Sequence, residues 1–380
     1  MRDKINQAKR IVFKFGTNVL TRSDGDIALS RIYSFIESIA DLKKQGKEVI
    51  IVTSGAVGLG VKKLKFDEKP TLVHLKQACA AIGQGQLTTI YEEGFDKFGI
   101  TSAQILLTEE DFSNRRRYLS LRNTLNALLE LDAIPIINQN DTVCSSELEC
   151  FVSDDVKVCF GDNDKLSALV MSKLDADLLV ILSDVDGLFD DNPNTNKDAK
   201  LISSVDNLTP DIEALGFEAS KRGRGGMKTK LEAAKVVMHS GGMAIIANGK
   251  TPDIIEDIFS GKEVGTLFLP MENLSGKKRW IAYATNIIGK IKINNGAKRA
   301  LIEKNASLLP SGILKINNYF KKGDVVSIVD MEDHEFAKGM VNYSSVDCKK
   351  IIGKQSDDIE EILGHKNYDA VITRDNIVIL

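Results

Sequence analysis

The sequence has 380 residues, more than one hydrophobic core usually holds, so we expect two domains. Hydrophobic residues make up 43% and charged residues 27%, a balance that excludes a largely disordered chain. The 50 basic and 53 acidic residues give a net charge of −3, which argues against a surface built to bind nucleic acid. No apolar run approaches the ~20 residues of a membrane helix, and the N-terminus lacks the apolar stretch of a signal peptide, so we expect a cytoplasmic protein.

Short apolar runs alternate with amphipathic stretches through the first two thirds of the chain. The runs predict strands at 11–15, 49–55, 103–108, 133–138, 178–184 and 243–249. The amphipathic stretches predict helices at 30–46, 72–98, 118–131, 164–174 and 229–240, the first of them capped by Ser30. Strands that alternate with helices indicate a layered α/β sheet, mainly parallel.

The pattern changes after about residue 265. Short β-like segments separated by Gly, Asn and Asp follow, with one helix-like stretch at 356–364. We therefore expect a larger domain at 1–270, a linker at 271–285 and a small β-rich domain at 286–380.

Polar and glycine-rich residues follow the predicted strands, where ligands of open α/β sheets gather. Lys14 lies in the first strand, two residues before Gly16. A lysine there either contacts a phosphate or points to solvent from an edge strand. The segment Thr53–Ala56 after the second strand either binds an anion through its backbone N–H groups or forms a tight turn.

Two further groups of polar residues lie after the fourth predicted strand and at the start of the helix that follows it. Asn138, Asn140 and Asp141 close the fourth strand, and 162–164 (Asp-Asn-Asp) open the next predicted helix. Any one of the three residues at 162–164 is more often a helix cap than a ligand, but three polar residues in a row exceed what a cap requires.

A glycine-rich loop at 223–226 precedes Lys230 and is a candidate phosphate clamp, since glycines let the backbone wrap closely around an anion. It lacks the spacing of a Walker A loop, as does the Gly-Lys-Thr segment at 249–251. Together, the lysines, amides and glycine loops favour phosphoryl transfer, which depends on positioning and charge neutralisation.

Five cysteines occur, at 79, 144, 150, 159 and 348. The odd number without a secretion signal favours free thiols, and the spacing of the middle three matches no zinc motif.

Six motifs resemble those of the amino acid kinase family. They are VFKFGTNVL at 12–20, IVTSGAVGLG at 51–60, PIINQNDTV at 135–143, GDNDKLSALV at 161–170, LSDVDGLF at 182–189 and GRGGMKTKLEAA at 223–234. The resemblance is strongest to members that phosphorylate the side-chain carboxylate of L-glutamate to γ-glutamyl phosphate, the first step of proline biosynthesis. The end of the chain resembles the PUA domain that bacterial members often carry.

The resemblance implies a mainly parallel central sheet sandwiched by helices, with ATP and Mg²⁺ as cofactors, feedback inhibition by proline, and a homo-oligomer. It implies that Lys14 and Lys230 contact the phosphates while Asp164 orients them, and that Ser54, Asp141 and Asn163 bind glutamate. The implied nucleotide-binding residues are Lys14, Ser183, Asp184, Arg224, Gly225, Gly226, Met227, Lys228, Thr229 and Lys230.

The sequence departs from the family pattern at two places. Nineteen residues separate Asp141 from Gly161, more than is usual, and Arg224 stands where threonine is common. Two alternatives remain: a kinase acting on aspartate or N-acetylglutamate, and an RNA-associated protein acting through its C-terminal end. Residues 286–380 carry 14 basic and 13 acidic side chains, a poor match to the phosphate backbone, so we expect no RNA binding.

Overall fold

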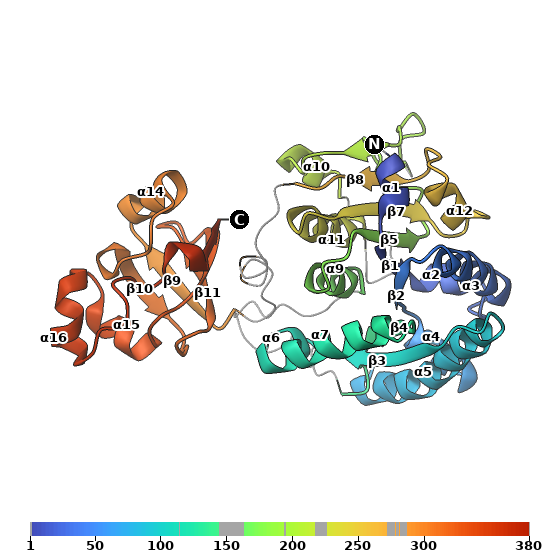
Figure 1. Cartoon of the computed structure of the whole chain (residues 1–380), viewed down its shortest axis with the longest axis horizontal. Coiled ribbons are helices and arrows are strands. Elements are labelled where there is room, and N and C mark those ends of the chain that lie inside the picture. Colours follow the sequence, from blue (N-terminus) through green and yellow to red (C-terminus); the bar gives the residue numbers. More distant parts are fainter. Residues whose placement is uncertain are drawn as a thin grey trace. The chain divides into compact units, whose positions relative to one another are not determined.

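The computed structural model describes residues 2–113, 115–143, 163–193, 195–216, 226–271, 278, 281 and 287–379. These residues form two compact units, one before residue 272 and one after residue 277 (Figure 1). Among the helices of the described ranges, none is both long and apolar enough to cross a bilayer.

The first unit is built on an eight-stranded sheet. Its strands are β1 (Arg10–Phe15), β2 (Glu48–Val52), β3 (Ser102–Leu107), β4 (Ile134–Gln139), β5 (Leu178–Ser183), β6 (Ser204–Val205), β7 (Met243–Asn248) and β8 (Thr266–Phe268). They lie in the order β3-β4-β2-β1-β5-β7-β8-β6, and every neighbouring pair is parallel except β7 and β8. The prediction of a mainly parallel α/β sheet is confirmed.

Helices cover both faces of this sheet (Figure 1). They are α1 (Asp3–Gln7), α2 (Thr17–Leu20), α3 (Leu29–Lys44), α4 (Ala56–Lys63), α5 (Val73–Asp96), α6 (Glu110–Ser113), α7 (Arg115–Glu130), α9 (Asn163–Lys173), α10 (Pro210–Ala214), α11 (Met227–His239) and α12 (Ile254–Phe259). On one face α3 packs against α5 and α12, and on the other α9 packs against α11.

The start of α3 differs from the prediction that Ser30 caps it. The helix begins at Leu29, and its N-cap residue is Ala28, which makes no side-chain cap. Ala28 is buried, and its N–H donates to the Leu20 carbonyl oxygen at 2.9 Å. The tertiary anchoring of Ala28 therefore sets the helix start, and Ser30 lies inside the first turn.

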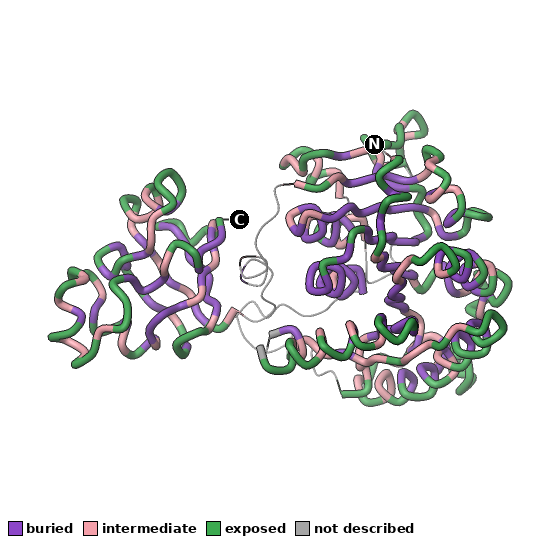
Figure 2. Tube along the Cα trace, in the orientation of Figure 1, coloured by how far each residue is buried: buried purple, intermediate pink, exposed green. Residues whose placement is uncertain are grey.

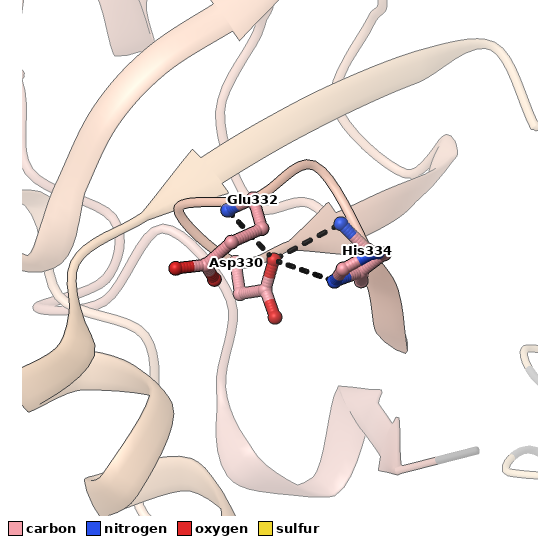
Figure 3. A group of neighbouring side chains, drawn as sticks. All are labelled: Asp330, Glu332 and His334. Carbon is pink, nitrogen blue, oxygen red and sulfur yellow. Dashed lines mark hydrogen bonds and ion pairs between the residues drawn. The ribbon is translucent and has the colours of Figure 1, made fainter.

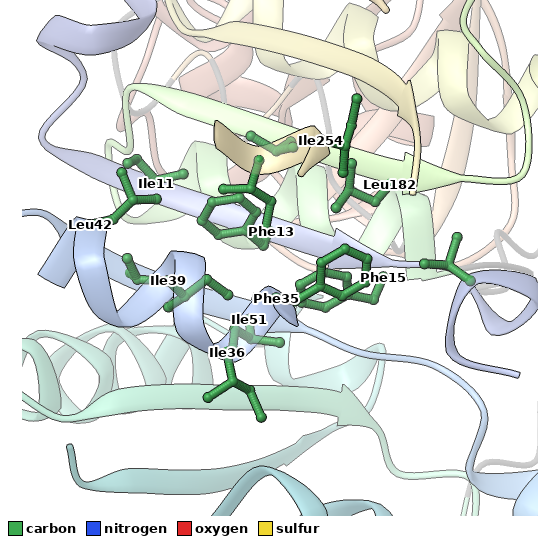
Figure 4. Packing of buried hydrophobic residues seen from close by; sticks show 14 of the residues in the cluster. Ile11, Phe13, Phe15, Phe35, Ile36, Ile39, Leu42, Ile51, Leu182 and Ile254 are labelled. Atoms are coloured by element: carbon green, nitrogen blue, oxygen red, sulfur yellow. The ribbon is translucent and has the colours of Figure 1, made fainter. Parts of the chain in front are cut away.

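Strand alternation in β1 separates the apolar core from the polar site. Ile11, Phe13 and Phe15 point to the face covered by α3 and α12, where they join a large buried cluster (Figure 4). The rings of Phe15 and Phe35 stack with centroids 4.9 Å apart. Because successive side chains of a strand point to opposite faces, Lys14 lies on the other face, where α9 packs on β1.

The second unit contains a five-stranded sheet with its own core. Its strands, in the order β10-β9-β11-β12-β13, are β9 (Gly289–Ile293), β10 (Ile313–Asn317), β11 (Val325–Val329), β12 (Glu335–Met340) and β13 (Ile377–Ile379). Its helices are α14 (Asn295–Lys304), α15 (Ser345–Ile351) and α16 (Ile359–Leu363), with 3₁₀ turns at Pro310–Gly312, Ser356–Asp358 and Arg374–Asn376. The predicted β-rich character and the helix at 356–364 are confirmed, whereas α14 and α15 were not predicted.

Two of the five cysteines fall in described segments. Cys79 and Cys348 are buried free thiols, as predicted. Burial raises the pKa of Cys348 to about 12, so this thiol stays protonated and unreactive at neutral pH. The predicted thiols at 144, 150 and 159 lie outside the described residues.

Candidate active site

The carboxyl ends of five adjacent strands, in the order β4, β2, β1, β5 and β7, meet at one edge of the first sheet. The polar segments singled out in the sequence follow these strands. An added Cβ on Gly16 would lie 3.8 Å from Lys14 Nζ and 3.9 Å from Ser183 Cα. The end of β1, its lysine and the end of β5 are therefore in close proximity.

Asp164 joins the two predicted phosphate-contacting lysines. Its Oδ1 lies 2.6 Å from Lys14 Nζ, and its Oδ2 lies 3.2 Å from Lys230 Nζ. Asp164 has no exposed surface, and the two lysines are only 4% and 5% exposed. The buried Asp164 carboxylate thus holds one lysine ammonium group at each of its two oxygens.

The backbone explains why these three side chains meet. Lys14 comes from β1, Asp164 from the first turn of α9, and Lys230 from the first turn of α11. Helix α9 is buried along almost its whole length (Figure 2), so a charged residue there needs partners within the protein. Thr229 adds its hydroxyl, which lies 3.0 Å from Asp164 Oδ2 and 3.0 Å from the Gly226 carbonyl oxygen.

Asn163 and Ser54, two predicted glutamate-binding residues, are in direct contact. Asn163 Nδ2 lies 3.0 Å from Ser54 Oγ, 2.6 Å from the Thr53 carbonyl oxygen and 2.9 Å from Asn138 Oδ1. Gly55 has φ = +102°, a conformation that side chains disfavour, so the turn after Ser54 requires glycine. Asp141, the third predicted residue, lies two residues beyond β4 at the same edge.

Thr53 also forms a buried side-chain hydrogen bond with Tyr91. Its Oγ1 lies 3.1 Å from the Tyr91 hydroxyl, and neither residue has more than 1% of its surface exposed. Burial raises the pKa of Tyr91, so the phenol remains protonated and able to donate. Tyr91 therefore supports the turn that carries Ser54.

Ser183 and Asp184, two predicted nucleotide-binding residues, lie at the end of β5. Asn18 Nδ2 donates to Asp184 Oδ2 at 2.8 Å, and Ser183 Oγ donates to Asp184 Oδ1 at 3.3 Å. Partial burial raises the pKa of Asp184, but these hydrogen bonds and the charge of Lys250 together outweigh it, so the pKa is below its usual value. Asp184 is therefore ionised at neutral pH.

The predicted nucleotide loop is described only in part. Gly226 is the N-cap of α11, and Met227, Lys228 and Thr229 form its first turn with Lys230. Arg224 and Gly225 lie outside the described residues. The described end of the loop is tied to the lysine pair through Thr229 and Asp164.

Two residues of this site were missed as site residues from the sequence. Asn138 was noted only as the end of a strand, yet its Oδ1 accepts from Asn163. Gln84, in the middle of α5, accepts from Asn138 Nδ2 at 2.8 Å and is 7% exposed. A lone buried glutamine in a helix gives no periodic or motif signal that would have identified it.

A separate cluster of titratable groups lies in the second unit, where Asp330, Glu332 and His334 surround a turn (Figure 3). Asp330 Oδ1 accepts the N–H groups of Glu332 and His334, each at 3.0 Å, and Lys298 Nζ donates to Oδ2 at 2.7 Å. The ion-pairing hydrogen bond from Lys298 lowers the pKa of Asp330 to about 2 despite the opposing effect of desolvation, with help from the two backbone hydrogen bonds. The Asp330 carboxylate binds two backbone N–H groups of its turn and the Lys298 ammonium group, so we assign it a structural role.

The model of the amino acid kinase family matches residues 9–248. The chain belongs to the amino acid kinase family. A second match, to the PUA domain, covers residues 289–363. Both resemblances predicted from the sequence motifs are confirmed.

The chain is also similar over nearly its whole length to proteins named glutamate 5-kinase. It is 48% identical to that of Caldanaerobacter subterraneus subsp. tengcongensis over 373 residues, covering 98% of both chains. It is 46% identical to that of Methanosarcina acetivorans over 380 residues, covering 98% of this chain and 96% of the other. Among solved structures, carbamate kinase from Giardia lamblia aligns with a TM-score of 0.49 and 18% identity, over 70% of this chain and 100% of that one.

Proposed function

We propose that the protein is a kinase that transfers the γ-phosphoryl group of ATP to the side-chain carboxylate of L-glutamate. The product is γ-glutamyl phosphate, and the reaction opens proline biosynthesis. The near-full-length similarity to glutamate 5-kinases supports the choice of substrate. In the structure, the observation that carries the proposal is the pair of buried lysines held on the two oxygens of Asp164.

Phosphoryl transfer needs little covalent help from the protein, because charge spreads over the phosphoryl oxygens and must be stabilised in place. Two ammonium groups fixed by one carboxylate provide such preorganised positive charge. The acceptor is a glutamate carboxylate, whose pKa of about 4 leaves it ionised at neutral pH. The substrate oxygen therefore attacks phosphorus directly, and no protein base is needed to activate it.

The two substrates occupy neighbouring parts of the same sheet edge in this proposal. Ser54, Asn163 and Asp141 hold glutamate at the ends of β2 and β4. The nucleotide is held at the end of β5 by Ser183 and Asp184, and by the segment 224–230. Lys14 is on β1, which lies between β2 and β5 in the sheet. In this proposal it is therefore close to the point where the phosphoryl group is transferred.

The donor set suits a Mg²⁺ ion that is bound mainly through ATP. Mg²⁺ usually keeps several waters and binds one or two carboxylates plus substrate phosphates. The described residues of the first unit contain no group of three His, Cys, Asp or Glu side chains within ligand distance. When bound, the ion would neutralise phosphate charge, and Asp184, which is ionised at neutral pH and lies among the proposed nucleotide-binding residues, would be a carboxylate available to hold it.

We further propose that the chemistry resides in a domain at 1–270, joined through a linker at 271–285 to a domain at 286–380. Every residue given a role above lies before residue 231. Inhibition by proline, a homo-oligomeric state, a cytoplasmic location and the absence of RNA binding stay predictions. Glutamate kinase activity in a soluble, folded 1–270 fragment would support the division, and a folded but inactive fragment would contradict it.

Substrate choice is tested with purified full-length protein, Mg-ATP and hydroxylamine, which traps an acyl phosphate as a hydroxamate. We expect γ-glutamyl hydroxamate from L-glutamate, and much less product from aspartate or N-acetylglutamate. Equal or greater turnover of either competitor would refute the glutamate assignment while leaving the kinase assignment intact.

A further inference from the structure

The amide groups around Asn163 form a chain whose polarity is set by the backbone. The N–H of Gln139 donates to Asn138 Oδ1 at 2.8 Å. A backbone N–H can only donate, so the atom that faces it must be the amide oxygen of Asn138. The Nδ2 end of Asn138 then faces Gln84 Oε1, at 2.8 Å.

The same reasoning fixes both neighbours of Asn138. Gln84 must present its oxygen to Asn138, so its Nε2 faces Thr88 Oγ1, 3.3 Å away. The Thr88 hydroxyl donates its hydrogen to the Gln84 backbone carbonyl oxygen at 3.0 Å. Its oxygen lone pairs therefore remain available to accept from Gln84 Nε2. Asn138 Oδ1, facing Asn163, forces Asn163 to present Nδ2.

Asn163 consequently has one amide end committed to the protein. Its Nδ2 carries two hydrogens and faces three oxygens, on Thr53, Ser54 and Asn138. The structure gives no hydrogen bond to Asn163 Oδ1 from any residue of the described ranges. An accepting oxygen at the sheet edge suits a ligand that donates, such as the α-ammonium group of an amino acid.

We propose that Gln84 is a positioning residue for this site: it holds the amide of Asn138 and thereby keeps Asn163 Oδ1 turned toward the ammonium group of the substrate. This inference rests on the proposed function. Gln84 can reach Asn138 because α5 lies against the turn after β2, where an added Cβ on the adjacent Gly83 would lie 1.8 Å from the Ala56 carbonyl oxygen. Removing the Gln84 amide leaves Asn138 Nδ2 buried without this acceptor, so the Asn138 amide shifts and weakens its contact with Asn163, which is then held by Thr53 and Ser54.

The test uses Gln84→Met in the full chain, which keeps the length of the side chain and removes its hydrogen bonds. We expect the KM for L-glutamate to rise about tenfold, the usual effect of one lost buried hydrogen bond, with the KM for ATP unchanged. The inhibition constant of glutarate, which has both carboxylates and no ammonium group, should also stay unchanged. Thr88→Val should shift the KM for glutamate in the same direction by a smaller factor.

Gln86→Met on the same helix is the matched control, since Gln86 is half-buried, lies outside this hydrogen-bonded chain, and should leave all three constants unchanged. Equal losses for glutamate, glutarate and ATP would show a general structural role and overturn the proposal, as would an unchanged KM for glutamate. The wild-type hydroxamate assay reports the proposed function separately. If the wild type does not phosphorylate glutamate, the proposed function and this substrate contact both fail. If it does and Gln84→Met behaves like Gln86→Met, only the present inference fails.

Discussion

Asp164 in the first unit and Asp330 in the second are both nearly without exposed surface, at 0% and 4%, but their partners differ in kind. Asp164 is bound by side chains from β1 and α11 that are 150 and 66 residues away in sequence. Asp330 accepts two backbone N–H groups from within four residues and one lysine from α14. The Asp330 carboxylate stabilises a turn by accepting N–H groups from within it. The Asp164 carboxylate instead fixes the positions of two lysine ammonium groups.

This difference predicts which carboxylate the reaction depends on. A buried ion pair is weak support for stability, because desolvation costs about as much as the charges gain. The lysine pair on Asp164 is therefore better explained by its position at the carboxyl edge of the sheet than by its energy. The Asp330 turn lies in the second unit, which contains none of the residues assigned a role in the reaction, so the loss of this carboxylate should affect folding alone.

The largest effect is expected for Asp164→Asn. The amide keeps the shape but leaves Lys14 and Lys230 without their shared counter-charge, so both lose their fixed positions. Losing one preorganised donor typically lowers kcat by about 10²–10³, so losing two should lower it by at least about 10³. Breaking a buried ion pair also costs about 3–5 kcal/mol of stability, so kcat should be measured at a temperature where circular dichroism shows the variant folded.

Asp330→Asn is the matched variant in the other unit and should retain the kcat of the wild type. A folded Asp164→Asn protein with wild-type kcat would contradict the claim that the reaction depends on Asp164. A folded but inactive Asp330→Asn protein would contradict the claim that the reaction does not depend on Asp330.

The next largest effect is expected for Lys14→Met and Lys230→Met, each of which leaves Asp164 one lysine. We expect kcat to fall by about 10²–10³ in each variant, while the melting temperature changes less than in Asp164→Asn. Lys235→Met, on the same helix as Lys230, removes a surface pair with Glu213 at 2.8 Å and should leave kcat unchanged. Full activity in Lys230→Met would show that the start of α11 is only structural.

A smaller effect is expected where α5 supports the site through backbone contact. An alanine Cβ at Gly83 would collide with the Ala56 carbonyl oxygen, so Gly83→Ala must displace the turn that follows Ser54. We expect a loss of about 1–3 kcal/mol in the free energy of unfolding, typical of overpacking, together with a higher KM for glutamate.

Gly85→Ala provides the control two residues along the same helix. An added Cβ there meets nothing within 4 Å, so this variant should gain about 0.5–1 kcal/mol with kinetics unchanged. Equal behaviour of the two alanine variants in chemical denaturation would contradict the role given to the close helix contact.

The sequence was informative where chemistry follows the end of a strand. Lys14, Asn163, Asp164 and Lys230 could be named because strand ends, helix starts and family motifs mark them. Gln84 could not, because its role depends on how closely α5 approaches β4, and this follows from tertiary packing at Gly83 rather than from any local pattern.

Helix α14 of the second unit was missed for a related reason. Within α14, Leu301 is the buried residue, so the helix has almost no apolar stripe for a periodicity search to detect. Its N-cap Asn294, which accepts from the Ala297 N–H at 2.8 Å, was the one local signal available. The strands of this unit were easier to predict, because they are short β-like segments separated by Gly, Asn and Asp.

The smallest effect is expected from titrating Asp330, and its sign follows from its pKa. The pKa of Asp330 is about 2 in the folded protein, below the ~3.9 of an unfolded aspartate. Its charge therefore stabilises the second unit fully above about pH 4, and this contribution declines as the pH falls toward 2. The stability difference between wild type and Asp330→Asn should be present at pH 7 and shrink below pH 4, as measured by urea unfolding at each pH. A difference that stays constant from pH 7 to pH 2.5 would mean that the shape of the turn, and not the charge of its carboxylate, is what the Lys298 pair stabilises.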